Sequence, residues 1–300
     1  MSTHRLYTPE GFEADVPKYS YGQLVQAMED QLIVTAKVLR CDHHGTLFAK
    51  LGDLDAIIPR GEAVAPFLSG ADRDIAILSC VGRNVKCIVI GEEVLPNGSI
   101  QFTLSRKAAQ WRALSWLEEN CGPGTILPAQ ITHLASFGAF VDLGCGVISL
   151  LPLSRISFSR SDHPSERFSL HQKIHVVVDR VDKAAHRIYL SHRELLGTWL
   201  ENAAQFREGE TVTGIIRNIQ EYGIFIELTP NLTGLADFKE GFQEKSMVSV
   251  NIRSIQPARQ KIKLQIVHSL PGTPFPTPIT YQRTDGTLEH WQYAPSVIPL

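Results

Sequence analysis

The sequence lacks the features that mark secreted, disulfide-linked and membrane-spanning proteins. Its five cysteines are odd in number and none are spaced as Cys-x-x-Cys, which argues against a disulfide framework and a cysteine zinc site. There is no run of about 18 apolar residues, the length that a membrane span needs. The first twenty residues contain no apolar core of the signal-peptide type. These absences predict a cytoplasmic protein with no membrane partner.

An excess of positive charge is also absent, since 29 Lys and Arg face 31 Asp and Glu for a net charge of -2. A polyanionic partner would therefore have to be met by a local basic patch. The sequence contains no phosphate-binding loop, nucleophile elbow or dinucleotide fingerprint. The HQKIH stretch at 171–175 lacks the glutamate of the zinc motif H-E-x-x-H and lies where a strand begins. We expect no enzymatic activity, no cofactor and no metal.

One pattern, by contrast, occurs twice: ASFGAFVDL at 135–143 and QEYGIFIEL at 220–228. The surroundings repeat as well, because Gly124, Gly138 and Leu143 recur 85 positions later as Gly209, Gly223 and Leu228. Both units close on similar strand patterns, RIYLS at 187–191 and KIKLQ at 261–265. The chain therefore contains at least two copies of one structural unit.

Each unit shows about five short strand patterns, rich in Val, Ile and Phe. Gly138 and Gly223 lie inside strand patterns, where glycine marks a bulge, a bend or a close approach of another backbone. Small five-stranded barrels bend their strands in this way. The register between the two units breaks at 154–174, which is longer than its counterpart at 237–250.

A weaker third unit precedes these two, at residues 32–107. It has strand patterns and turns in a similar order, but its aromatic pair is incomplete. His44 stands at the first aromatic position, and either Leu47 or Phe48 stands near the second. If the fold is the same, this unit has lost the pair.

Helical patterns at 106–120 and 191–206 lie between the units and predict spacer helices that are anchored by tryptophans. The expected organisation is an N-terminal arm with a helix (1–31), a degenerate repeat (32–107), a linker helix (108–123), a repeat (124–193), a second linker helix (194–206), a repeat (207–268) and a Pro-rich tail with a hairpin pattern around Asp285-Gly286 (269–300). The tail also contains three aromatics, Tyr281, Trp291 and Tyr293. We expect them to cover the end of the third barrel rather than to bind a partner.

The twofold pattern [FY]-G-x-F-[VI]-[DE]-L, together with the closing R/K-I-x-L strand, resembles the S1-type RNA-binding domain. That family is named for the largest protein of the bacterial small ribosomal subunit. The resemblance covers 124–193 and 209–267 well and 32–107 weakly, and a three-repeat bacterial homologue of that ribosomal protein fits the whole chain. It implies an all-β fold with linking helices, made of three tandem five-stranded OB-fold barrels that bind single-stranded RNA.

The resemblance also implies which residues contact RNA: in the middle repeat Phe137, Phe140, Asp182 and Arg187, and in the last repeat Tyr222, Phe225 and Lys261, to which the neighbouring Lys263 is added. Two family positions differ in this sequence. The position that is often histidine is Pro152 in the middle repeat and Asp237 in the last, and the acidic turn position of the last repeat falls near Gln256. An aspartate at this position would repel phosphate.

Elementary chemistry supports the same assignment, since aromatics on an exposed strand face stack bases at about 1–3 kcal/mol per base. The net charge is +2 over 124–195, +1 over 206–267 and zero over 30–107, so the middle repeat is the best RNA-binding candidate. Repeated weak sites gain affinity through effective concentration. The partners we expect are single-stranded RNA, most simply mRNA, and the small ribosomal subunit, contacted through the first repeat by a protein that is monomeric when free.

Three alternatives remain open. The aromatics could be core residues, since an aromatic in a strand is usually packed. Asp142 and Glu227 hold one position in two repeats, so a shared strand-end role is favoured over a catalytic one. The second function considered is a protein-binding scaffold or accessory subunit of an RNA-degrading complex, which the near-zero charge and Asp237 would suit.

Overall fold

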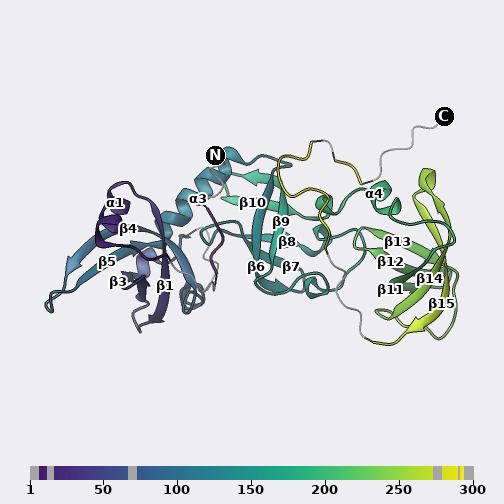
Figure 1. Ribbon diagram of the computed structural model, residues 1–300, viewed down its shortest axis with the longest axis horizontal. Helices are drawn as coiled ribbons and strands as arrows, with labels where there is room; N and C mark the ends of the chain where they lie inside the picture. Colours follow the sequence, from purple (N-terminus) through teal and green to yellow (C-terminus); the bar gives the residue numbers. More distant parts are fainter. Residues whose placement is uncertain (1–6, 12–16, 67–72, 273–278, 290, 294–300) are drawn as a thin grey trace. The chain divides into compact units, whose positions relative to one another are not determined.

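The computed structural model describes residues 7–11, 17–66, 73–272, 279–289 and 291–293 (Figure 1). It contains three five-stranded sheets, which are connected by short helices. The chain forms two compact units: one contains Met1–Gly122, Val141–Ser149 and Val181–Ile188, and the other contains Pro123–Phe140, Leu150–Arg180 and Tyr189–Leu300. The predicted fold class, an all-β chain of three tandem OB-fold barrels with linking helices, is confirmed.

The first sheet is a closed barrel with the strand order β1-β2-β3-β5-β4. Its strands are β1 (Ile33–Cys41), β2 (Leu47–Leu51), β3 (Leu54–Ile58), β4 (Asn84–Val94) and β5 (Ile100–Ser105). Alternate residues of β1 point inward, so that Val34, Ala36 and Val38 are buried. The helix α1 (Tyr21–Glu29) precedes the barrel and begins at a Ser20–Gln23 capping box; the other elements of this part are the 3-10 turn η2 (Arg60–Glu62) and helix α2 (Arg73–Leu78).

The third sheet is a closed barrel with the equivalent order, β11-β12-β13-β15-β14. Its strands are β11 (Thr211–Gln220), β12 (Gly223–Thr229), β13 (Leu232–Ala236), β14 (Met247–Gln256) and β15 (Lys261–Leu270), with the turn η7 (Pro257–Arg259) before β15. Both barrels have a bulge at the same place in their first strand, and it makes Phe225 pair with Asn218 and Phe48 pair with Arg40. The first repeat is therefore the same barrel. Phe48 holds the second aromatic position, and Leu47 is fully buried.

The middle sheet has the order β10-β9-β6-β7-β8, with β10 and β8 at its edges. Its strands are β6 (Ile126–Ala135), β7 (Gly138–Asp142), β8 (Ile148–Pro152), β9 (Lys173–Asp182) and β10 (Arg187–Ser191), and the 3-10 turns η4 (Leu153–Arg155) and η5 (Pro164–Glu166) follow β8. In the closed barrels the two corresponding edges pair as parallel strands, for example Leu235 with Lys263. In the middle sheet the hydroxyl of Ser149 on β8 donates a hydrogen bond to the carbonyl of Ile188 on β10 (2.9 Å).

The repeated glycines start β7 and β12 at points where another strand passes very close. A Cβ at Gly138 would lie 2.5 Å from the carbonyl oxygen of Leu151, and one at Gly223 would lie 2.6 Å from that of Ala236. No side chain fits at such a distance. The glycine between the two aromatics is thus required by the facing strand.

Of the two helical patterns between the repeats, the first forms one continuous helix and the second does not. Helix α3 (Arg106–Asn120) spans the helical pattern at 106–120 and is capped by the hydroxyl of Ser105. The prediction of one helix over 191–206 is wrong, because the segment folds as the 3-10 turn η6 (Arg193–Leu196) followed by the short helix α4 (Trp199–Ala203). Gly197 has a φ of 86° and Thr198 caps α4, so the chain restarts there.

In the described residues 279–289 of the tail, the expected hairpin around Asp285-Gly286 does not form. Within residues 279–289 and 291–293, the strand pairing is a single bridge between Thr287 and Thr125. Tyr293 packs against the core of the third barrel and donates a hydrogen bond to the carbonyl of Asn231 (2.5 Å). Tyr281 instead packs against the middle repeat, so the prediction that it would cover the third barrel is wrong for this residue.

Candidate nucleic-acid interface

The two predicted aromatic pairs have nearly the same geometry. The ring centroids of Phe137 and Phe140 are 6.0 Å apart at 86°, and those of Tyr222 and Phe225 are 6.0 Å apart at 88°. The first ring of each pair is mostly exposed, at 58% for Phe137 and 69% for Tyr222. The second ring is half-buried and meets the first edge to face, which fixes its orientation. Each of these two repeats thus presents one exposed ring that is supported by a half-buried second ring.

In the last repeat a groove of about 410 Å³ brings several predicted site residues together. Phe225, Lys261 and Lys263 all line it, and so do Asp237 and Gln256. The parallel pairing of β13 with β15 produces this arrangement, because it sets Lys263 opposite Leu235, the residue that also pairs with Phe225. An aromatic ring and two ammonium groups on one concave surface suit a stacked base with its phosphate.

Asp237 limits the charge of this groove. Its carboxylate forms an ion pair with the ammonium of Lys263 at 3.6 Å, and both side chains are exposed. Exposed pairs of this kind contribute little to stability. The pair does offset the charge of Lys263, so a phosphate must compete with an internal anion for that lysine.

The remaining predicted residues of the middle repeat lie at the turn between β9 and β10. The carboxylate of Asp182 accepts a hydrogen bond from the backbone N–H of Ala185 (3.0 Å) and so shapes the turn. Arg187 is the exposed first residue of β10. In the same turn His186 lies 3.0 Å from the carboxylate of Glu118 and meets the ring of Trp111 edge-on. Trp111 thus anchors α3, as the sequence predicts.

The first repeat differs from the last on the corresponding face. The guanidinium of Arg40 lies over the ring of Phe48, 3.5 Å from its centroid. The strand pairing of Ile57 with Thr103 matches that of Leu235 with Lys263, so Thr103 stands where the last repeat has a lysine. Two residues earlier on the same strand, Gln101 stands in place of Lys261. The first repeat has therefore lost both cations, and its remaining ring is covered.

The matching carboxylates, Asp142 at the end of β7 and Glu227 within β12, are structural in both repeats. Asp142 is buried and accepts hydrogen bonds from the backbone N–H groups of Glu10, Gly144 and Gly146. Glu227 is buried and bonded to two arginines. Their surroundings agree with the expected strand-end role, since each carboxylate fixes a neighbouring segment of chain.

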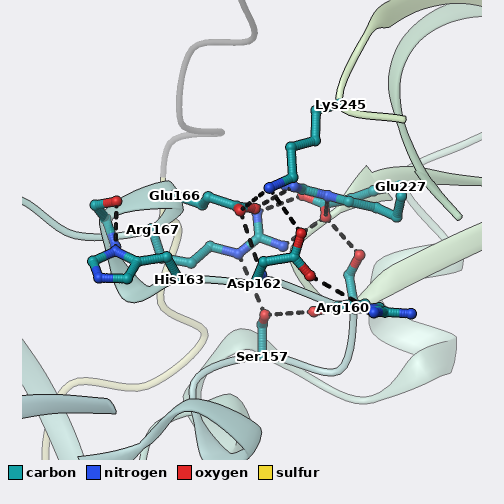
Figure 2. Close-up of polar contacts among 11 residues, drawn as sticks. Ser157, Arg160, Asp162, His163, Glu166, Arg167, Glu227 and Lys245 are labelled. Atoms are coloured by element: carbon teal, nitrogen blue, oxygen red, sulfur yellow. Dashed lines mark hydrogen bonds and ion pairs between the residues drawn. The ribbon is translucent and has the colours of Figure 1, made fainter. Parts of the chain in front are cut away.

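Around Glu227 a network of charges links the middle repeat to the last (Figure 2). Arg167 binds both carboxylate oxygens at 2.6 Å, and Arg217 binds one of them at 2.6 Å. Burial by itself would raise the pKa of Glu227, but the two arginines outweigh it and lower that pKa. Arg217 also reaches Glu166 at 2.5 Å, and Lys245 pairs with Asp162 at 2.7 Å and with Glu166 at 3.4 Å.

No local signal in the sequence identifies this network. Arg167 and Glu227 are 60 residues apart, Arg167 belongs to no recognisable motif, and the repeated motif that contains Glu227 gives no sign of its partner. The only hint is the extra length of 154–174 relative to the last repeat, and this segment supplies the middle repeat's share of the contacts.

One histidine of the middle repeat, His192, is part of the packed interior. His192 is fully buried, lies 2.7 Å from the carbonyl of Ile156 through Nδ1 and is 3.2 Å from the hydroxyl of Tyr281 through Nε2. Burial lowers the pKa of His192 to about 4, so the ring is neutral at physiological pH. The described residues include no cluster of His, Cys, Asp or Glu that could hold a metal ion. Nor does any helix in that part of the chain have the length and apolar character to cross a membrane.

Comparison with known proteins places these observations in a family. A family model of the S1 RNA binding domain matches residues 121–193, the middle repeat. Small ribosomal subunit protein bS1 of Staphylococcus haemolyticus is 26% identical over 287 residues, which are 90% of this chain and 68% of that protein. The bS1 protein of Staphylococcus aureus (strain COL) is 27% identical over 270 residues, or 84% of this chain and 66% of that protein. The chain thus spans about two thirds of the length of these relatives.

Among solved structures, GSP13 from Bacillus subtilis is 26% identical, with a TM-score of 0.24 over 29% of this chain and 72% of that one. A multidomain protein with nucleic acid binding domains from Streptococcus pneumoniae is 11% identical, with a TM-score of 0.26 over 79% of this chain and 74% of that one. TM-scores this low carry no structural argument, so the assignment rests on the sequence matches and the barrels.

Together the repeated barrels and the S1 match define a protein of the S1-type RNA-binding class. Within that class the chain is a bS1-like protein, related to the staphylococcal proteins at modest identity over most of its length. The predictions of family and of RNA binding are confirmed.

Proposed function

We propose that this protein binds single-stranded RNA, most simply mRNA, by stacking bases on Phe137 and Phe140 in the middle repeat and on Tyr222 and Phe225 in the last. The observation that carries the proposal is the matched pair of edge-to-face aromatics, each with an exposed first ring. Every base has a π-face, so stacking of this kind is tolerant of sequence.

The backbone of the RNA is held by cations of the same two repeats. Lys261 and Lys263 share a groove with Phe225 and supply this charge in the last repeat. Arg187 is the exposed candidate in the middle repeat, while Asp182 acts by shaping the turn that presents it. Ammonium and guanidinium groups release counterions from the RNA, which makes such binding sensitive to salt.

We further propose that the protein works in the cytoplasm at the small ribosomal subunit, as a binding protein without catalytic activity. The bS1 relatives support this setting. The first repeat has lost the cations that the last repeat carries, and Arg40 covers its ring, so it is assigned to docking on a protein surface. In this proposal the free protein is a monomer.

A filter-binding titration with a single-stranded RNA tests the stacking mechanism. The double variant Phe137→Ala/Phe140→Ala should bind more weakly by about 1–3 kcal/mol per base that loses its partner ring. Tyr21 is an exposed aromatic on α1, beside the first repeat, to which no RNA-contacting residue is assigned, so Tyr21→Ala serves as the aromatic control and should bind as the wild type does. Equal affinity of the wild type and the double variant would refute stacking at this platform.

The second candidate, a protein-binding scaffold in an RNA-degrading complex, is favoured by the Asp237–Lys263 pair, which weakens one RNA groove. Co-sedimentation separates the two. Association with small subunits supports the first proposal, whereas exclusive association with a nuclease complex supports the second.

A further inference from the structure

A second hollow, distinct from the groove of the last repeat, begins at the exposed ring of Phe137. It has a volume of about 520 Å³, and its lining includes Phe158, Arg160, Ser161 and Arg193. This volume lies within the range of about 300–1,000 Å³ that is usual for ligand sites. Two of the residues that line the hollow stand at positions named by the family resemblance: Phe137, and Pro152 where the family often has histidine. The other lining residues have no role in that resemblance.

The chemistry of this hollow is that of an anion site. Two arginines and the hydroxyls of several serines line it, and the described lining residues include no carboxylate. The hydroxyl oxygen of Ser161 is buried and has no hydrogen-bond partner. A buried hydroxyl without a partner is costly and is usually satisfied by a ligand or water. The nearby Asp162 lies 3.6 Å from Arg160, but it also binds Lys245 at 2.7 Å.

Contacts within the protein already hold two residues of the wall, Phe158 and Arg193, in place. The ring of Phe158 stacks on Tyr293 with centroids 3.7 Å apart and planes 9° apart. The guanidinium of Arg193 lies 4.5 Å from the centroid of Phe158 and 3.4 Å from the carbonyl of Ser154. A cation oriented in this way loses little further freedom on binding.

The same wall is attached to the last repeat. The backbone N–H of Phe158 donates to the side-chain oxygen of Asn231 (3.1 Å), and the hydroxyl of Ser159 donates to Glu227 (2.5 Å). The hollow therefore extends from Phe137 along the segment that contains Phe158 and Ser159, which contacts the last repeat. Figure 2 shows Arg160 at one side of this junction, close to Asp162.

We infer that this hollow is a phosphate subsite for the RNA strand as it leaves the base stacked on Phe137. In it, Arg160 and Arg193 hold one backbone phosphate, and the hydroxyl of Ser161 donates a hydrogen bond to a phosphate oxygen. Of the two RNA-binding repeats, the middle one has this subsite. Most of its residues come from the segment 154–174, whose counterpart in the last repeat is shorter. The inference rests on the proposed function, since it requires RNA at Phe137.

The salt dependence of binding to an oligouridylate of about 12 nucleotides, within the usual site sizes of OB folds, tests this subsite. Arg160 is largely exposed, so Arg160→Ala should leave the fold intact. Loss of one phosphate contact should make the slope of log K against log salt shallower by about 0.7 for a single strand. Arg253→Ala, which removes an exposed arginine on β14 outside both hollows, should leave the slope unchanged.

Ser161→Ala supplies an independent measurement. A hydroxyl carries no charge, so its loss should weaken binding at every salt concentration while the slope stays that of the wild type. A wild-type slope in Arg160→Ala, or an equal change in Arg253→Ala, overturns the subsite. Retained binding that is still sensitive to Phe137→Ala/Phe140→Ala would then leave the proposed function standing, whereas absence of RNA binding by the wild type overturns both.

Discussion

Arg167 and Glu227 form a buried, two-pronged ion pair in which both hydrogen bonds measure 2.6 Å and both side chains are 1% exposed. Arg167 comes from the longer segment of the middle repeat, and Glu227 lies on β12, the strand that carries Phe225. Charges removed from water in this way are stabilising only while every partner is present. The pair therefore makes the fold of each repeat depend on the other.

Glu227→Gln should destabilise the protein strongly. It leaves the guanidinium of Arg167 buried without a full counter-charge, and breaking such a pair costs about 3–5 kcal/mol. Urea unfolding of the whole chain measures the loss. The exposed Asp162 belongs to the same network, and Asp162→Asn should change the midpoint little. Similar losses in the two variants would show that the buried pair has no special role.

Asp237→Asn should strengthen RNA binding by the last repeat, because it releases Lys263 from its internal ion pair. The effect is best measured in a Phe137→Ala/Phe140→Ala background, where the middle repeat has lost its stacking rings. Glu240→Gln removes another exposed carboxylate and serves as the charge-matched control. A gain that appears equally in both variants would reflect net charge rather than the release of Lys263.

Gly138→Ala should lower stability by about 1–3 kcal/mol, as overpacking does. The added Cβ would lie 2.5 Å from the carbonyl oxygen of Leu151, a backbone atom of β8 rather than the end of a flexible side chain. Gly91→Ala is the control, since a Cβ there meets no atom within 4 Å. Thermal unfolding should separate the two variants, and equal melting temperatures would contradict the close approach.

The contribution of His192 to stability should fall on acidification, against an opposite trend from Asp142, whose pKa is raised by burial to about 7. The folded pKa of His192 is lowered to about 4 by burial, below its ordinary value of 6.5. Its contribution is therefore complete above pH 6.5 and is lost progressively as the pH falls toward 4, because the unfolded state binds the proton more tightly. Glu227 adds a second loss at lower pH, since its pKa is lowered from 4.5 and its charge disappears there.

Urea midpoints measured between pH 7.5 and 4.5 test this window. His192→Asn should be less stable at neutral pH but should show a shallower decline across the window. The exposed His268 gives the control His268→Asn, which should follow the wild-type curve. An unchanged decline in His192→Asn would assign the acid sensitivity to other groups.

The barrels could be predicted because their information is local and repeated. Alternation in the strands, the glycine between two aromatics and the closing strands recur at a fixed spacing, and each reflects one bend of one barrel. The first repeat shows the limit of this reasoning. His44 is noticeable in the sequence, but strand pairing was needed to show that Phe48 holds the second position and that Thr103 replaces a lysine.

The interface was predictable only in part, because contacts between distant segments leave no periodic trace. The aromatic pairs follow from their motif, and their exposure agrees with an accessible platform. The hollow around Arg193 and Phe158 has no motif, since it depends on a tail residue, Tyr293, that stacks from far along the chain. The break at Gly197 illustrates the same point for the linker, where a left-handed glycine overrode a helical pattern.

The ion pair between Asp237 and Lys263 has a consequence for rates as well as affinities. An internal carboxylate that can replace a phosphate on Lys263 provides a route by which RNA leaves the last repeat quickly. In the middle repeat Arg160 also has a carboxylate neighbour, Asp162 at 3.6 Å, but Lys245 holds that carboxylate at 2.7 Å. Asp162 is therefore less free to replace a phosphate, and the middle repeat would retain the strand in the meantime. Release and recapture at the last repeat would then let the protein shift its position along a message without dissociating from it.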